Sequence, residues 1–354
     1  MKIAIVSTHL FWGRGGMEKV ISSLMGELEQ CGDTVSLILC EGANTNWANN
    51  YAYYEISSCR GLKRPVFVWQ LTRLLNSLNP DIILAVDHRA VFYSRLYRWL
   101  RPDSVKIGVW MHVSLNNYSI KHFNNLKFAD FYLAISSGMA NNLKKRLPVN
   151  ANKEKIYIVH NPTPLVEYAV PRSTIPIFVY IGRLRYDHDK RVNDFLNALS
   201  GVHGLWKALI IGDGPETDKL KRMAVELGIS SCITWTGWVN DPWAYVEEAS
   251  VLVLTSRNEG FGLVLVEALS RGIPCISSNC PDGPADIIEH GKNGWLYPPY
   301  SVSELTRLLQ MVVDDCGVLP DQYLVKKSME KFTAKTVMNN IRQILLRQIS
   351  NKKN

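Results

Sequence analysis

Short runs of apolar residues alternate with amphipathic segments along almost the whole chain. In the first half, runs rich in β-branched and aromatic residues lie at 2–7, 34–40, 81–86, 106–111, 131–136 and 155–160. Helical periodicity covers 16–30, 66–78, 89–100 and 138–147 between them. Because the apolar runs lack polar alternation, we expect strands buried on both faces, which is typical of a parallel sheet covered by helices.

The same alternation resumes after a stretch at 161–176 that holds four prolines. Proline removes a backbone donor and stops helices, so this stretch is predicted to be a linker. Strands are then predicted at 177–182, 207–212, 232–237, 251–256 and 274–278. Helices are predicted at 191–200, 215–227, 241–249, 262–271 and 301–313, with a helical tail at about 320–350. The chain is therefore predicted to be α/β, with two doubly wound, Rossmann-like domains at 1–165 and 173–330 that face each other across a cleft.

Composition excludes several other classes of protein. The 354 residues are 47% hydrophobic and 20% charged, which is ordinary for globular domains and excludes a disordered or fibrous chain. No run reaches the roughly 18 apolar residues of a membrane-spanning helix, and the opening apolar run is too short for a secretory signal. Seven cysteines without CxxC spacing predict buried or incidental thiols. These features predict a cytoplasmic protein.

The net charge of +8 lies in the first half of the chain. Residues 1–165 carry 19 Lys and Arg against 11 Asp and Glu, whereas residues 166–354 carry 21 of each. A basic domain joined to a neutral one indicates different partners for the two. A basic module that binds nucleic acid is an alternative, but no nucleic-acid motif is present.

Two groups of residues suit a bound diphosphate. Gly13, Gly15 and Gly16 follow the first strand, where backbone amides can approach a phosphate at a helix N-terminus; a tight turn is the alternative. Arg183 and Lys190 follow the first strand of the second domain and can hold a leaving diphosphate, unless they are solvated surface cations.

The sequence Asp187-His188-Asp189 has the DxD form of some divalent-metal sites. Its cationic neighbours make a metal unnecessary for binding phosphate, so we expect no metal.

Two glutamates eight positions apart frame the most specific stretch, which runs from Glu259 to Glu267 with Gly260-Phe261-Gly262-Leu263 between them. It joins a predicted strand to a predicted helix, and its glycines allow a ligand to approach the backbone. Glu267 is expected to accept hydrogen bonds from two ribose hydroxyls and Glu259 from sugar hydroxyls. The alternatives are a capping and a surface glutamate.

This stretch resembles the E-x7-E signature of the family 4 retaining glycosyltransferases of GT-B fold. Further matches follow in the same order and spacing over nearly the whole chain: Gly15-Gly16, Ala134-Ile135-Ser136-Ser137, Asn161-Pro162, Gly182-Arg183-Leu184, Gly212-Asp213-Gly214 and Gly272-Ile273-Pro274. The phrases GGMEKVI, FADFYLAISSG and GIPCISSNCPDGPADII are similar to the lipopolysaccharide core α-1,6-galactosyltransferases of enteric bacteria.

The resemblance implies a role for each matching residue of the second domain. Glu267 would hold the ribose, Arg183 and Lys190 the diphosphate, and Glu259 with the amides of Phe261, Gly262 and Leu263 the donor sugar. The base would lie by Trp238 and Val239, although Trp238 can equally be a packing residue.

In the first domain, the resemblance implies that the amide of Gly16 contacts the phosphates. His112 matches the family's histidine near the donor sugar; a structural histidine is the alternative. Asp87 would orient the acceptor. The C-terminal helix at 331–354 would pack back toward this domain.

The implied reaction is transfer of a hexose, most simply galactose, from a UDP-sugar to the lipopolysaccharide core, with retention of configuration and without a metal or other cofactor. UDP-glucose and UDP-N-acetylglucosamine are alternative donors, and a UDP-sugar epimerase of the same fold is an alternative enzyme. A phosphorylated acceptor at an anionic membrane face would be attracted to the basic domain. Residues 89–101 interleave cations with aromatics as interfacial helices do, although a core-facing aromatic stripe has the same pattern.

Overall fold

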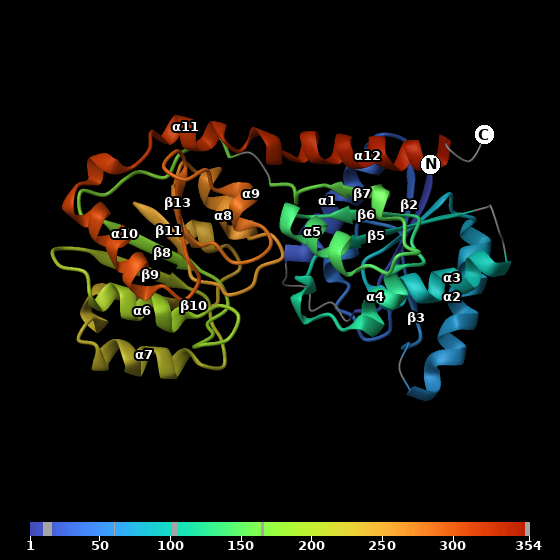
Figure 1. Ribbon diagram of the computed structural model, residues 1–354, viewed down its shortest axis with the longest axis horizontal. Helices are drawn as coiled ribbons and strands as arrows, with labels where there is room; N and C mark the ends of the chain where they lie inside the picture. Colours follow the sequence, from blue (N-terminus) through green and yellow to red (C-terminus); the bar gives the residue numbers. More distant parts are fainter. Residues whose placement is uncertain (10–15, 60, 101–104, 164–165, 351–354) are drawn as a thin grey trace. The chain divides into compact units, whose positions relative to one another are not determined.

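The computed structural model describes residues 1–9, 16–59, 61–100, 105–163 and 166–350 (Figure 1). The chain divides into two compact units. Unit 1 consists of Met1–Pro162 together with Ala334–Asn354, and unit 2 consists of Thr163–Thr333. The chain therefore passes between the units twice, and unit 2 is an insertion within unit 1.

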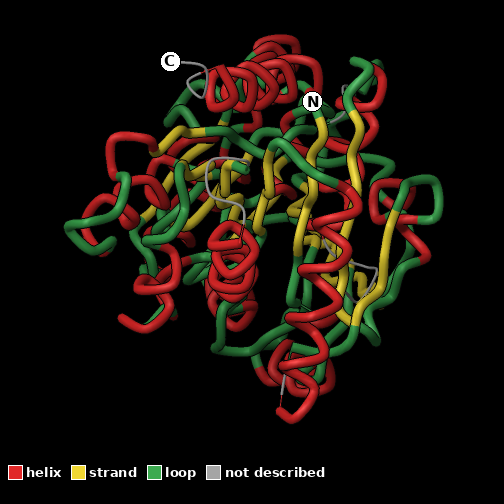
Figure 2. The backbone as a smooth tube through the Cα atoms, turned by 90° about the vertical axis from the view of Figure 1, so that its right-hand side faces the viewer, coloured by secondary structure: helices red, strands yellow, loops and turns green. Residues whose placement is uncertain are grey.

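Unit 1 is built on a sheet of seven parallel strands in the order β3-β2-β1-β4-β5-β6-β7 (Figure 2). The strands are β1 (Lys2–Val6), β2 (Thr34–Cys40), β3 (Tyr53–Ile56), β4 (Ile82–Ala85), β5 (Lys106–Met111), β6 (Phe131–Ala134) and β7 (Ile156–Ile158). The order reverses between β1 and β4, which are neighbours in the sheet. In doubly wound sheets, ligands bind outside the carboxyl ends of the strands at such a reversal.

The helices of unit 1 are α1 (Gly16–Gln30), α2 (Arg64–Leu78), α3 (His88–Leu100), α4 (Ile120–Leu126), α5 (Ser137–Arg146) and α12 (Ala334–Ser350). Helix α12 returns from the far end of the sequence to lie beside α1 (Figure 1). Arg342 Nε donates to Asp33 Oδ2 over 2.8 Å, and Gln348 Nε2 donates to the Tyr157 hydroxyl over 3.2 Å. The last helix is thus part of unit 1.

Unit 2 is built on a second parallel sheet of six strands in the order β10-β9-β8-β11-β12-β13. The strands are β8 (Ile177–Ile181), β9 (Lys207–Ile211), β10 (Ile233–Gly237), β11 (Val251–Leu254), β12 (Cys275–Ser278) and β13 (Gly294–Tyr297). The helices are α6 (Val192–Ser200), α7 (Thr217–Glu226), α8 (Leu263–Leu269), α9 (Pro284–Ile287), α10 (Val302–Asp314) and α11 (Gln322–Lys327). The order reverses between β8 and β11, so these two strands mark the expected ligand edge of unit 2.

The α/β class and the two doubly wound sheets confirm the prediction from alternating apolar and amphipathic segments. Strands β3 and β13 and helix α4 escaped that prediction. Three of the four side chains of β3 are not buried, because it is an edge strand, so it lacks a continuous apolar run. Strand β13 and helix α4 are short, and so is the four-residue helix α9, which was not predicted either.

Two predicted helices are wrong. Of 241–249, only a short 3₁₀ turn, Pro242–Tyr245, is helical, and the Asp241 carboxylate caps its start by accepting from the Trp243 amide. The tail at 320–350 is not continuous either. It breaks between α11 and α12, where Phe332 is fully buried.

No helix in the described parts of the chain is both long enough and apolar enough to cross a bilayer.

Candidate active site

Two loops of unit 2 meet beyond the carboxyl ends of β8 and β9. The amide of Gly182 donates to Ile211 O over 3.0 Å, and the carbonyl of Gly182 lies so close to Gly212 that a Cβ there would be 2.0 Å from its oxygen. Only glycine permits this approach, and Gly212 also has a positive φ of 135°. The contact presents Arg183 at this edge with an exposed side chain. Within the described residues, its guanidinium makes no ion pair or hydrogen bond, so it is available to a ligand.

Lys190 and Glu259 form the ion pair at the reversal between β8 and β11. Lys190 Nζ lies 2.5 Å from Glu259 Oε1, with side chains 28% and 11% exposed. The backbone around Lys190 is tied to the end of β11, because its carbonyl accepts from Thr255 Oγ1 over 2.9 Å and Arg257 N donates to Asp189 O over 2.7 Å. The backbone of Lys190 is therefore held against the end of β11, and the ion pair stays partly open to solvent.

The β11–α8 loop (residues 255–262) carries Glu259 into α8. Phe261 is 2% exposed, so its side chain points into unit 2 and only its backbone can contact a ligand. Gly262 begins the helix with a φ of 95°. Gly283 packs against the loop so tightly that a Cβ would lie 2.0 Å from Phe261 O. The close packing of Gly283 and the buried ring of Phe261 thus hold the loop against unit 2.

Glu267 lies on α8 and is oriented by a tryptophan that the sequence analysis missed. Trp243 Nε1 donates to Glu267 Oε2 over 3.0 Å, and the Trp243 side chain is largely buried. The guanidinium of Arg271 lies over the Trp243 ring at 4.4 Å. One carboxylate oxygen is therefore occupied and the other, Oε1, has no hydrogen bond in the part of the chain that the structure describes. Nothing in the sequence pairs residues 24 positions apart, so only folding reveals this contact.

Trp238 and Val239 follow β10 at the same edge of unit 2. The carbonyl of Gly237 accepts from Gly212 N over 2.9 Å, which joins this loop to the loop after β9. Trp238 is 51% exposed. The exposed part of the Trp238 ring suits contact with a planar base. The role of Trp238 in binding the base stays a prediction.

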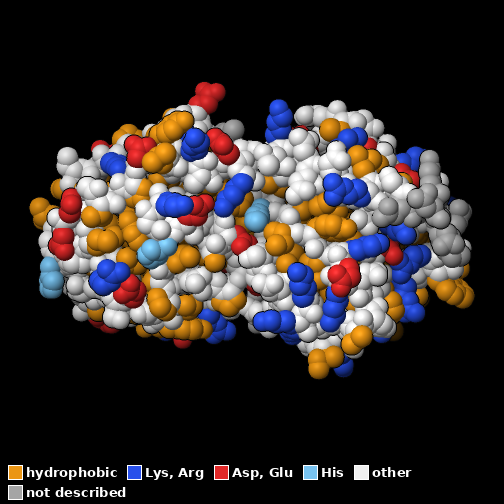
Figure 3. Space-filling model, turned by 45° about the horizontal axis from the view of Figure 1, so that its top comes forward, with side chains coloured by type: hydrophobic (Ala, Val, Ile, Leu, Met, Phe, Trp, Pro, Cys, Tyr) orange, Lys and Arg blue, Asp and Glu red, His pale blue; other side chains and the backbone are white. Residues whose placement is uncertain are grey.

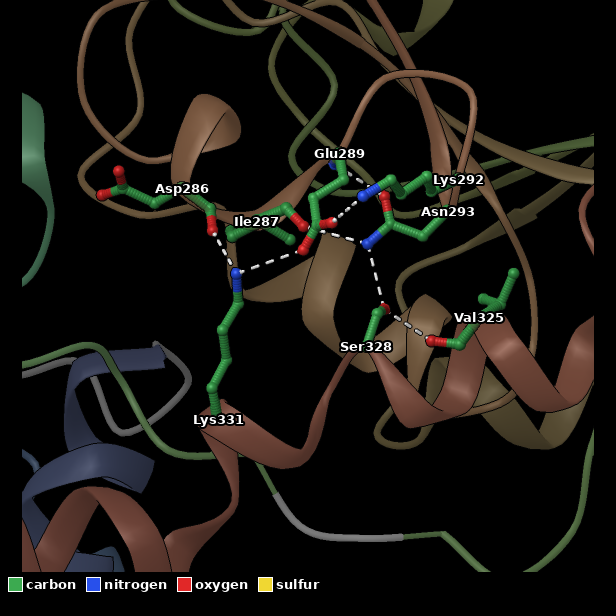
Figure 4. Close-up of polar contacts among 8 residues, drawn as sticks. All are labelled: Asp286, Ile287, Glu289, Lys292, Asn293, Val325, Ser328 and Lys331. Atoms are coloured by element: carbon green, nitrogen blue, oxygen red, sulfur yellow. Dashed lines mark hydrogen bonds and ion pairs between the residues drawn. The ribbon is translucent and has the colours of Figure 1, made fainter.

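The segment that precedes α12 makes polar contacts with α9 and with the loop between α9 and β13 (Figure 4). Lys331 Nζ donates to Asp286 O over 3.1 Å and lies 3.8 Å from Glu289 Oε1. Asn293 Nδ2 donates to Ser328 Oγ over 2.9 Å. These contacts hold residues 328–331 against unit 2.

Phe332 follows directly and connects this segment to the β11–α8 loop. Its ring centre lies 5.6 Å from that of Phe261 in an edge-to-face arrangement, and its carbonyl accepts from Thr163 N over 2.8 Å. Thr163 and Thr333 form an isolated β-bridge. The two passages of chain between the units therefore run together, and the buried Phe332 rests on the loop that carries Glu259. No sequence motif marked this residue.

In unit 1, Asp87 lies at the reversal between β1 and β4. Its carboxylate accepts from Thr8 N and Thr8 Oγ1, each over 2.7 Å, and from the amides of Arg89 and Ala90, each over 2.9 Å. The residue is 1% exposed. Asp87 thus caps α3 and ties it to the end of β1; its expected role with the acceptor stays a prediction.

His112 directly follows β5. Both ring nitrogens are buried and make no hydrogen bond within the described residues. The ring packs edge-to-face on Trp110 with centres 4.2 Å apart. Burial lowers the pKa of His112 to about 3, which the neighbouring Asn161 side chain only partly offsets. His112 is therefore neutral at physiological pH. Buried polar atoms without partners are uncommon and suit a group that waits for a ligand.

Gly16 begins helix α1 after β1. Gly13 and Gly15, the other glycines predicted to approach phosphate, lie outside the described residues.

One set of side chains has the spacing of metal ligands. Ligand atoms of Asp187, His188 and Glu216 lie within 4.8 Å of one another. Glu216 Oε2 already accepts from Tyr186 N over 3.0 Å, and Asp187 and His188 are exposed. Such exposed clusters are common on protein surfaces, so this one does not identify a metal site.

Comparisons with known proteins connect this geometry to a family. A model described as Glycosyltransferase Family 4 matches residues 14–166, and one described as Glycosyl transferases group 1 matches residues 169–327. A lipopolysaccharide 1,6-galactosyltransferase of Salmonella typhimurium is 33% identical over 88% of this chain and 90% of its own. The chain belongs to the family 4 glycosyltransferases. The resemblance inferred from the motifs is thereby confirmed.

Two further comparisons agree with membership of these glycosyltransferases. The lipopolysaccharide 1,6-galactosyltransferase of Escherichia coli K12 is 31% identical over the full length of both chains. The solved structure of the lipopolysaccharide outer core galactosyltransferase WaaB in its apo form matches with a TM-score of 0.89 and 30% identity, covering 98% of this chain and 100% of that one. The GT-B fold is confirmed.

Proposed function

We propose that this glycosyltransferase moves galactose from UDP-galactose to the lipopolysaccharide core, with retention of configuration and without a metal. The names of its relatives support the donor and the acceptor. The donor site is assigned to the carboxyl edge of unit 2, at the reversal between β8 and β11.

The arrangement of charges at that edge carries the proposal. Arg183 is exposed and unpaired within the described residues, and Lys190 is partly exposed beside Glu259. Two cations at one strand edge suit the two phosphates of UDP, because charge-assisted hydrogen bonds to phosphate are the strong ones. Glu267, with one oxygen held by Trp243, presents the other to the ribose. Glu259 then serves the sugar hydroxyls.

The proposed reaction forms a bond between the acceptor oxygen and the anomeric carbon as the bond from that carbon to the diphosphate oxygen breaks. The proton of the acceptor hydroxyl passes to the departing diphosphate oxygen on the same face. Charge develops on the leaving diphosphate, which Arg183 and Lys190 stabilise. His112 keeps the role that the family resemblance implies for it, and its lowered pKa makes it a neutral imidazole.

The experiment offers the purified protein UDP-galactose, UDP-glucose and UDP-N-acetylglucosamine, each with core-truncated lipopolysaccharide, and weighs the acceptor by mass spectrometry. We expect a hexose to be gained from UDP-galactose alone, unchanged by EDTA and lost in Glu259→Gln. Gain from another donor would contradict the sugar, and loss of transfer in EDTA would contradict the metal-free reaction. Conversion of UDP-galactose without an acceptor would indicate an epimerase.

We further propose that unit 1 contacts the inner face of the cytoplasmic membrane through α2 and α3. Trp69 on α2 is 59% exposed and Trp99 on α3 is 80% exposed, and Leu62 just before α2 is 99% exposed. The guanidinium of Arg73 lies 5.4 Å from the centre of the Trp69 ring. Lys and Arg side chains and hydrophobic ones are interspersed over unit 1 (Figure 3, right). Exposed aromatics among cations suit an anionic membrane surface.

Sedimentation with vesicles tests this contact. We expect binding to vesicles that contain anionic lipid, weaker binding as salt rises, and little binding to neutral vesicles. Trp69→Ala with Trp99→Ala should weaken it, whereas Tyr245→Ala, an exposed aromatic of unit 2, should not. Equal loss in the control would contradict the assignment to α2 and α3.

A further inference from the structure

Two histidines of unit 1 lie together at the carboxyl edge of its sheet. His88 begins α3 directly after Asp87, and His122 lies in the first turn of α4. Their ring centres are 4.2 Å apart, and the ring of Tyr118 packs edge-on against both, at 5.6 and 4.9 Å. Neither histidine belongs to the sequence motifs, and the proposed reaction uses neither. They are referred to as the imidazole pair.

Hydrogen bonds fix where each ring of the imidazole pair carries its proton. His122 Nδ1 accepts from the amide of Ser119 over 3.0 Å, in the capping box of α4. The amide nitrogen of Asn125 faces His88 Nδ1 at 3.1 Å and donates to it. A neutral imidazole that accepts at Nδ1 carries its hydrogen on Nε2. Both rings therefore present an N–H donor at Nε2.

Both Nε2 donors are open to solvent. In the part of the chain that the structure describes, neither Nε2 has a hydrogen-bond partner, and neither is among the buried polar atoms that lack one. Because the ring centres are so close, one tetrahedral oxyanion can bridge the two donors with two of its oxygens. The caps and ring contacts thus leave two neighbouring imidazole N–H donors without a partner in the described residues.

The charges around the imidazole pair favour an anion. Burial, with smaller effects of the nearby His122, Arg89 and His9, lowers the pKa of His88 to about 4, while Asp87 acts in the opposite direction. Arg89 and His9 are exposed. The Asp87 carboxylate opposes a bound anion, but it is 1% exposed and accepts four hydrogen bonds, which offset part of its charge. Burial also raises the pKa of Tyr118, which stays a neutral phenol.

We propose that His88 and His122 bind a phosphate group carried by the saccharide acceptor, with Arg89 supplying the nearby positive charge. The assignment to the acceptor rests on the proposed function. The anion site itself does not, because it follows from two neighbouring donors and the cations beside them. Its effect is to select phosphorylated acceptors.

The first test uses sulfate, a dianion whose own charge does not change between roughly pH 5 and 8, and follows the histidine ring signals by NMR. We expect saturable shifts of His88 and His122 and none of His203, which is exposed in unit 2. Because a bound anion stabilises the imidazolium, it raises the pKa of His88, so sulfate should bind more tightly as the pH falls. Absence of saturable shifts would overturn the anion site, whatever reaction the protein catalyses.

The second test separates binding from structure by the choice of substitution. Asparagine places an acceptor near Nδ1, so His88→Asn and His122→Asn keep the bonds to Asn125 and Ser119 but lose the Nε2 donors. Glutamine keeps a donor near Nε2 and loses the Nδ1 acceptor. We therefore expect loss of sulfate binding in the asparagine variants and its retention in the glutamine variants. The opposite order would mean that the imidazole pair only caps α4 and packs.

The third test compares transfer to a core-truncated acceptor with and without phosphatase treatment. In His88→Asn or His122→Asn alone, KM for the phosphorylated acceptor should rise about tenfold, the size of one lost charge-assisted hydrogen bond. KM for the dephosphorylated acceptor and for UDP-galactose should not change. His203→Asn is the matched control. Sulfate binding without any effect of acceptor phosphate would show a site for free anion and overturn the assignment to the acceptor.

Discussion

The hydrogen bond from Trp243 to Glu267 gives the sharpest prediction about the donor site. It fixes which carboxylate oxygen is free, because Oε2 receives Trp243 Nε1 over 3.0 Å. In Glu267→Gln, the same indole N–H requires the amide oxygen as its acceptor. The NH₂ group is then turned toward the ribose, where it cannot accept from hydroxyls.

The expected magnitudes follow from this geometry. Hydrogen bonds to a charged group contribute about 1.5–3 kcal/mol and neutral ones about 1 kcal/mol, so Glu267→Gln should weaken UDP binding about tenfold. Trp243→Phe leaves the charge but frees the carboxylate to rotate, and we expect a loss of about threefold. In the double variant the freed amide can turn its oxygen to the ribose. The double loss should therefore be smaller than the sum by about 0.5–1 kcal/mol.

The assay is isothermal titration of UDP against the four proteins at one pH and salt concentration. Trp206→Phe is the matched control, because Trp206 is also buried in unit 2 but donates to the Val202 carbonyl. It should leave UDP binding unchanged. Additive losses, or an equal loss in the control, would refute the view that Trp243 acts through Glu267.

Three further perturbations test other parts of the structure. Gly283→Ala should lower the free energy of unfolding by about 2–4 kcal/mol and weaken UDP-galactose binding, because the new Cβ would meet the backbone of the β11–α8 loop. Gly228 also has a positive φ but has open space around it, so Gly228→Ala should show only the backbone strain. Equal effects of the two substitutions would contradict the steric clash at Gly283. Burial raises the pKa of Asp33, but hydrogen bonds from Arg342 and the amino terminus outweigh it, so the net pKa is lowered. The ionised Asp33 carboxylate therefore stabilises the fold above its unfolded pKa of about 3.9, and this stabilisation is lost as the pH falls through the lower folded pKa. Asp33→Asn should make hydrogen exchange in α1 and α12 depend less on acid pH. An unchanged dependence would contradict this role of Asp33. Phe332→Ala should lower the free energy of unfolding by about 3–5 kcal/mol. Phe332→Leu refills most of the space and should raise KM for UDP-galactose more than the Kd of UDP. Equal changes in the two constants would mean that the ring does not position the β11–α8 loop.

Local patterns in the sequence were enough to predict the two doubly wound sheets. A strand buried on both faces requires a continuous apolar run, and a crossover helix requires an amphipathic one, so the pattern of each segment specifies its type. The same holds for the loops, because residues at a strand's carboxyl end lie at the ligand edge whatever the rest of the chain does. Arg183, Lys190 and Glu259 were found in this way. The edge strand β3 and the nine-residue segment at 241–249 were not, because their structure depends on neighbours rather than on periodicity.

Only the tertiary structure decided the contacts between residues far apart in the chain. Trp243 donates to Glu267, and the ring of Phe332 packs on that of Phe261. The imidazole pair belongs to the same class, since His88 and His122 come together only when α3 and α4 pack. No periodicity records such partners, because each is selected by the shape and charge of a surface that exists only once both segments have folded.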